Sequence, residues 1–123
     1  MSTKSLYERL GSYDGIAAFV NELLDRVKQD SQLRRFWDHR GSDRLEKEKQ
    51  LLIDYLCSSA GGQSHYSGRD MKLAHKGMKI SESDWQVFLI HAGATMMFLN
   101  VPEQEQNDVA AFVATLKQDI VET

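Results

Sequence analysis

The chain has 123 residues and a mass of 14.0 kDa, so we expect one domain, residues 1–123, with one hydrophobic core. Its 18 acidic and 15 basic residues give a net charge of −3 and are intermixed, which disfavours binding to nucleic acid. No apolar run reaches the roughly 20 residues of a membrane helix, and no secretory signal is apparent at the start. A lone cysteine, Cys57, cannot form an internal disulfide. These features predict a cytoplasmic protein without a membrane partner.

The first half of the chain is expected to be helical, because its apolar residues recur at helical rather than alternating spacing. A long helix is predicted from about Asp14, its N-cap, with an apolar stripe from Ile16 to Val27. A corner containing Leu33, Phe36 and Trp37 follows. A second helix is predicted to start near Ser42 and to end at Gly61-Gly62.

The second half begins with a polar segment, Gln63 to Arg69, and a short helical piece around His75. Ser81 and Asp84 resemble a capping box at the start of the next helix, which ends before Pro102. The last helix opens near Pro102 and is predicted to bury Val109, Phe112, Val113, Leu116 and Ile120. The expected fold class is all-α.

The histidines point to a metal site of only one kind. No two of them lie three or four residues apart, as zinc-binding pairs on a helix do. A single histidine is sufficient at a haem iron, because the porphyrin supplies four nitrogens. His75 is the best candidate, with Met71, Met78 and Ile80 nearby, although spacing alone favours a partly buried structural histidine. The four histidines are His39, His65, His75 and His91.

Lys49 is unusual because it falls within the apolar stripe of the second predicted helix, four residues from both Leu45 and Ile53. Its ammonium group can reach solvent while its methylenes pack on the core, or it can act in a pocket. Gln50 can donate an amide N–H to a ligand or lie on the surface.

Other polar and aromatic residues allow two interpretations. Phe36 and Trp37 are typical of core aromatics at a helix corner, but a flat ring there could also press on a flat cofactor. Tyr66 and Arg69 could bind a carboxylate or meet solvent. His91 is interpreted as structural.

The segments that together carry a family resemblance are Leu6-Tyr7-Glu8-Arg9-Leu10-Gly11, Leu33 to Trp37, Gly61-Gly62, Tyr66-Ser67-Gly68-Arg69-Asp70-Met71, Ala74-His75 and Met78-Lys79-Ile80. They resemble the group I truncated haemoglobins, in which helices stack two over two around haem. The resemblance covers nearly the whole chain, and its densest part runs from the glycine pair to the segment that follows His75.

This resemblance implies haem b, iron protoporphyrin IX, with His75 as its proximal iron ligand and Trp37 stacked on the haem. Leu24 stands where the family usually has a tyrosine, so Lys49 and Gln50 become the distal polar pair, with Lys49 a possible iron ligand. The paired glycines of the first corner are replaced by Gly11 and Gly15. The other cofactor-binding residues implied are Phe36, Leu45, Ile53, Tyr66, Arg69, Met71, Met78, Ile80 and Trp85.

The resemblance further implies reversible binding of oxygen or another diatomic gas, such as nitric oxide or carbon monoxide, for carriage, storage or sensing. The alternative is an enzyme for nitric oxide dioxygenation or a related redox detoxification. It would depend on an external reductase, because the chain has no room for a reductase module. A third possibility is a cofactor-free helical interaction module. A monomer or weak dimer is expected.

Overall fold

The computed structural model describes residues 5–37, 42–62 and 75–122, and these residues form helices and no strands. The expected all-α class is therefore confirmed. The helices are α1 (Leu6–Arg9), α2 (Ser12–Gln29), α3 (Ser42–Ser59), α5 (Glu82–Phe98), α6 (Glu103–Ala114) and α7 (Lys117–Ile120), with a 3₁₀ turn, η1, at Arg34–Phe36.

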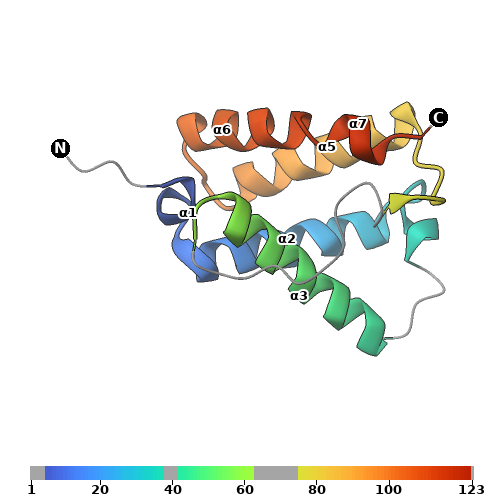
Figure 1. The fold of residues 1–123 in the computed structure, drawn as a ribbon, viewed down its shortest axis with the longest axis horizontal. Coiled ribbons are helices and arrows are strands. Elements are labelled where there is room, and N and C mark those ends of the chain that lie inside the picture. Colours follow the sequence, from blue (N-terminus) through green and yellow to red (C-terminus); the bar gives the residue numbers. More distant parts are fainter. Residues whose placement is uncertain (1–4, 38–41, 63–74, 123) are drawn as a thin grey trace.

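Two layers of helices make up the fold. In Figure 1, α5 runs alongside α6 and α7 in one layer, while α2 and α3 cross in the other. Helix α2 packs on both α3 and α5 and so joins the layers, and α1 contacts α2 and α6. In the part of the chain that the structure describes, no helix is both long and apolar enough to cross a membrane.

The core consists of three clusters of buried side chains that follow from these contacts. The first lies between α2 and α3, the second between α2, the η1 corner and α5, and the third where α5 meets α7 and the segment after His75. Their buried members are, in this order, Ile16, Val20, Leu24, Ile53 and Cys57; Leu23, Val27, Leu33 and Ala92; and Ile80, Trp85 and Ile120.

Helix α2 starts earlier than its sequence suggests, so the prediction of Asp14 as N-cap was wrong. The N-cap is Gly11, whose φ of 97° lets the chain turn directly from α1 into α2. The Gly15 N–H then donates to the Gly11 carbonyl at 3.2 Å. A Cβ atom on Gly15 would lie 1.9 Å from the carbonyl oxygen of Leu10, so this corner requires glycine at position 15.

The C-terminal helix is also not continuous as predicted, but breaks between α6 and α7. The Thr115 hydroxyl donates to the Phe112 carbonyl at 2.6 Å, and the Thr115 and Leu116 N–H groups donate to carbonyls three residues back. Such tight bonds replace the α-helical pattern and end the helix. Of the five residues predicted to be buried here, only Ile120 is buried, and the other four are half-buried.

Candidate haem site

His75 is the first described residue after the segment 63–74, and it is half-buried. Its carbonyl accepts a hydrogen bond from the Met78 N–H at 3.2 Å, which closes a turn directly after the histidine. Met78 then packs on the cluster of Ile80 and Trp85. Of the apolar side chains predicted around His75, Met78 and Ile80 therefore lie together, against the first turn of α5.

The aromatic corner reaches this cluster from a distant part of the sequence. Phe36 packs on the cluster that contains Ile80 and Trp85 and also on the one that contains Leu33. Trp37 packs on the Leu33 cluster and on the α2–α3 cluster. Phe36 and Trp37 thus stand where the three clusters meet, between the predicted proximal and distal residues.

Asp84 ties the aromatic corner to the start of α5. Its carboxylate lies 2.6 Å from the Arg35 guanidinium and accepts a hydrogen bond from the Gln32 amide at 2.7 Å. The Arg35 guanidinium also covers the Phe36 ring, 4.2 Å from its centroid. Asp84 and Ser81 complete the predicted capping box, which is confirmed.

The charge of Asp84 is stabilised by these contacts although the side chain is only 3% exposed. Burial opposes ionisation, but the hydrogen bonds from Arg35, Gln32 and Ser81 outweigh it and hold the pKa of Asp84 well below its usual value. A carboxyl whose pKa is lowered by folding stabilises the folded state above its unfolded pKa of about 3.9, and this contribution disappears as the pH falls below that value.

We therefore expect Asp84→Asn to lower the free energy of unfolding at pH 7 by about 1–3 kcal/mol, because the Arg35 charge loses its partner. The difference from the unmodified protein should shrink as the pH is lowered from about 5 towards 2. Urea unfolding at several pH values measures both effects. Glu82→Gln is the control, since Glu82 lies on the same first turn of α5 as Asp84 but forms an exposed ion pair, with Lys117 of α7. Equal losses for the two variants, or a pH-independent loss for Asp84→Asn, would contradict this account.

The predicted distal residues are divided between the core and the surface. Leu24 and Ile53 are buried in the α2–α3 cluster, at 5% and 4% exposure, and Leu45 is half-buried on α3. Leu24 is thus a buried aliphatic residue of α2.

Lys49 and Gln50 both have polar partners within reach. The Lys49 ammonium lies 3.1 Å from the Glu46 carboxylate, one helical turn earlier, and its side chain is 26% exposed. The Gln50 amide donates to the Tyr13 hydroxyl at 2.9 Å and to the Asp54 carboxylate at 3.0 Å, on the exposed surface. The contact with Tyr13 joins α3 to α2 and was not foreseen.

His91 has a structural role, as its position on α5 suggested. Its Nε2 atom lies 2.7 Å from the Asp30 carboxylate, which also accepts hydrogen bonds from the backbone N–H groups of Gln32 and Leu33. The contact with His91, followed by these backbone bonds, lowers the pKa of Asp30. His91 therefore anchors the end of α2 to α5.

The donor chemistry of the described residues is compatible with haem. Within residues 5–37, 45–62 and 75–122, no group of three or more His, Cys, Asp or Glu side chains could hold a metal ion. A porphyrin needs only one protein ligand together with flat and apolar neighbours, and His75, Phe36, Trp37 and Met78 are residues of these kinds. Five of the residues singled out lie outside the described residues: His39, His65, Tyr66, Arg69 and Met71.

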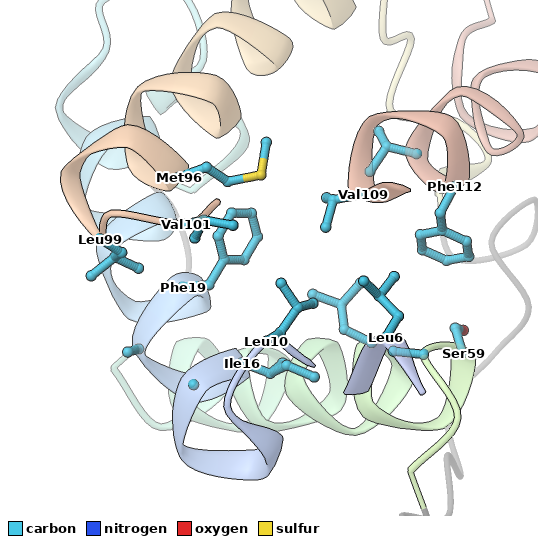
Figure 2. Close-up of a pocket in the computed structure, with 15 residues that line it drawn as sticks. Leu6, Leu10, Ile16, Phe19, Ser59, Met96, Leu99, Val101, Val109 and Phe112 are labelled. Carbon is cyan, nitrogen blue, oxygen red and sulfur yellow. The ribbon is translucent and has the colours of Figure 1, made fainter. Parts of the chain in front are cut away.

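A separate apolar cavity of about 330 Å³ was not predicted. Figure 2 shows Leu6, Leu10, Met96 and Val109 around it, and Ser59 supplies a hydroxyl at its margin. Its walls come from α1, α2, α3, α5 and α6, and none of the residues implied to bind the haem is among the residues that line it. It explains why residues on α6 that were expected to be buried are only half-buried.

Comparison with known proteins defines the class. Residues 5–122 match the model of a family described as bacterial-like globin, and the chain belongs to that family. Within it, the similarity is to truncated haemoglobins, as the sequence motifs suggested. A group 1 truncated haemoglobin of Tetrahymena pyriformis is 26% identical over 118 residues, 96% of this chain and 95% of that protein. Group 1 truncated haemoglobin GlbN of a Synechocystis species is 29% identical over 115 residues, 90% of this chain and 89% of that protein.

Solved structures show the same fold. The Q46E mutant of the Tetrahymena pyriformis truncated haemoglobin, in its Fe(III) form, superposes with a TM-score of 0.89 at 25% identity, covering 98% of this chain and all of that one. The 2/2 haemoglobin of a Synechococcus species has a TM-score of 0.86 at 23% identity, covering 96% and 98%. The two-over-two arrangement is therefore confirmed, and family membership implies haem-based binding of a gas.

Proposed function

We propose that this protein binds haem b through His75 and uses it to bind oxygen or another diatomic gas reversibly. The observation that carries the proposal is the position of His75. The residue is half-buried and begins a turn, and Met78 and Ile80, three and five residues later, pack with Trp85 and Phe36. His91, the other described histidine, is held by Asp30. We also propose that the protein is cytoplasmic and a monomer or weak dimer.

The haem would be held mainly by apolar and aromatic side chains. His75 would be the axial ligand and Trp37 the stacking aromatic, while Tyr66 and Arg69 would face the haem carboxylates. When bound, haem supplies an iron atom with a coordination position for a gas. The remaining contacts would come from Phe36, Leu45, Ile53, Met71, Met78, Ile80 and Trp85.

The protein's own contribution is to exclude water from the gas site and to set the hydrogen bonds available there. Leu24 and Ile53 are buried and apolar and can donate no hydrogen bond. Control of the gas would therefore depend on Lys49 and Gln50. The contacts that these two side chains make in the structure are partly exposed. An exposed ion pair such as Lys49–Glu46 typically contributes only about 0–1 kcal/mol to stability. Either side chain can therefore exchange its partner at little cost.

Substitutions on α3 separate the proposed role of Lys49, as an iron ligand, from that of Gln50, as a hydrogen-bond donor to the bound gas. Lys49→Ala should convert a six-coordinate low-spin spectrum to a five-coordinate or water-bound one, because the amine can bind iron when neutral. Gln50→Leu should leave coordination unchanged and speed oxygen dissociation severalfold, as expected for one lost hydrogen bond of about 0.5–1.5 kcal/mol. Absorption spectra and stopped-flow oxygen release provide the measurements.

Lys47→Ala is the matched control, because it removes the same charge from an exposed position of α3. If Lys49→Ala and Gln50→Leu both behave like this control, the assignment of the distal pair is wrong.

The proposed reversible binding is tested by cycling the ferrous haem-loaded protein between oxygen and argon. Reversible binding predicts that the two absorption spectra interconvert over repeated cycles without oxidation. The alternative, nitric oxide dioxygenation, predicts that added nitric oxide is consumed by the oxygen-equilibrated protein, with turnover sustained only when a reductase is supplied. Sustained consumption would favour the enzyme over the gas carrier.

A further inference from the structure

Glu122, which follows α7, is hydrogen-bonded to the segment that follows His75. One carboxylate oxygen, Oε2, accepts from the Gly77 N–H at 3.1 Å, and the other, Oε1, accepts from the Lys79 N–H at 2.9 Å. The Glu122 N–H in turn donates to the Ile80 carbonyl at 2.9 Å. Three hydrogen bonds thus connect one residue of the C-terminal segment to residues two, four and five positions after the histidine.

The turn after His75 has a backbone shape that needs such a partner. Gly77 and Lys79 have φ values of 86° and 56°, and the second is uncommon for a residue with a Cβ atom. In this conformation the two N–H groups are not used by a helix, and both point to the same carboxylate. Neighbouring N–H groups that converge in this way form a natural anion site. The hydrogen bonds from Gly77 and Lys79 accordingly lower the pKa of Glu122.

Apolar packing fixes the other end of this connection. Ile120 is buried against Ile80 and Trp85, and Val121 packs on the same cluster. The main chain that leads to Glu122 is therefore anchored on α5, which is capped and tied to the aromatic corner through Asp84. The Glu122 side chain is exposed, but it follows directly on two residues that pack on the core.

We propose that Glu122 is a positioning residue for His75. By holding the Gly77 and Lys79 N–H groups, its carboxylate fixes the turn that the His75 carbonyl closes, and so the direction in which the imidazole leaves the backbone. This inference rests on the proposed function of His75 as iron ligand. The new element is that Glu122, which is far from His75 in sequence, sets how firmly His75 is held as the axial ligand.

The connection itself can be tested without haem. In Glu122→Ala, the Gly77 and Lys79 amides of the apoprotein should exchange with solvent roughly threefold to tenfold faster than in the parent, the effect of one lost hydrogen bond each. Asp119→Ala is the matched control, because it removes an exposed carboxylate from the neighbouring α7. Amide-resolved hydrogen exchange by NMR gives the rates. Unchanged exchange at both amides in Glu122→Ala would overturn the proposal.

The effect on the ligand is read from the haem-loaded protein. Glu122→Ala should shift and broaden the iron–histidine stretching band in the resonance Raman spectrum of the ferrous protein. It should also speed haem loss severalfold. Glu122→Gln keeps one acceptor oxygen, so its stretching band and its rate of haem loss should lie between those of Glu122→Ala and the parent. Asp119→Ala should match the parent. A parent protein with no such band would refute the proposed role of His75 but not the connection. A parent band that Glu122→Ala leaves unchanged would refute the positioning role alone.

Discussion

His75→Gly is expected to abolish protein coordination of the haem iron. The residue is the half-buried histidine at the start of the turn that packs on Ile80 and Trp85. In its proposed role as iron ligand, its replacement by glycine would leave a space beside the iron without a nitrogen donor. The ferrous spectrum should change from that of a histidine-ligated haem to that of haem without a protein ligand. Imidazole added to the solution should partly restore the original spectrum, because it can occupy the vacated space.

A second histidine gives the control for this experiment. His91→Asn removes an imidazole that pairs with Asp30 at 2.7 Å on α5, so it should lower stability and leave the haem spectrum unchanged. A native ferrous spectrum in His75→Gly without imidazole would show that another residue binds the iron.

Gly15→Ala should lower the stability of the fold more than Asp84→Asn or His91→Asn. The added Cβ atom would lie 1.9 Å from the Leu10 carbonyl oxygen and 2.8 Å from its carbon, and these are backbone atoms that cannot move aside alone. Overpacking commonly lowers the free energy of unfolding by about 1–3 kcal/mol. We expect a clash with backbone atoms to cost at least the upper end of this range. For a domain of this size, about 3 kcal/mol corresponds to a fall in Tm of roughly 10 °C.

Gly93→Ala is the matched control, since Gly93 lies within α5 and a Cβ atom there would meet nothing within 4 Å. Alanine favours a helix over glycine, so this variant should gain about 0.5–1 kcal/mol. Thermal unfolding followed by circular dichroism compares the two. If Gly15→Ala is no less stable than the parent, the close approach of α1 and α2 at this corner is wrong.

The long helices could be predicted from sequence because each carries enough apolar residues to define a stripe. The stripe from Ile16 to Val27 marks α2, and the capping pair Ser81–Asp84 marks the start of α5. Helix α1 was not predicted, because four residues cannot show a helical period. The start of α2 was misplaced because it depends on the left-handed conformation of Gly11, which composition does not reveal.

The candidate site was predictable where the motif is local and not where contacts join distant residues. His75, Met78 and Ile80 are close in sequence; the structure joins Met78 to His75 by a backbone hydrogen bond and packs Met78 on the cluster that contains Ile80. The partner of Gln50, Tyr13, is 37 residues away, and Glu122 is 43 residues from Lys79, so neither pairing has a signal in the sequence. The break at Thr115 was missed because the apolar residues keep their helical spacing across it. The break depends on one side-chain hydrogen bond, from the Thr115 hydroxyl to the Phe112 carbonyl, which competes with the backbone bonds of the helix.

The central claim, that this chain is a haem protein with His75 as its ligand, is tested most directly by titrating haem into the purified apoprotein. We predict saturation at one haem per chain, a Soret band typical of a histidine-ligated haem, and an increase in unfolding free energy on the order of 4 kcal/mol at a roughly 1,000-fold excess over Kd. The titration should fail to give that band in His75→Gly. A colourless parent protein whose stability haem does not change would contradict the account.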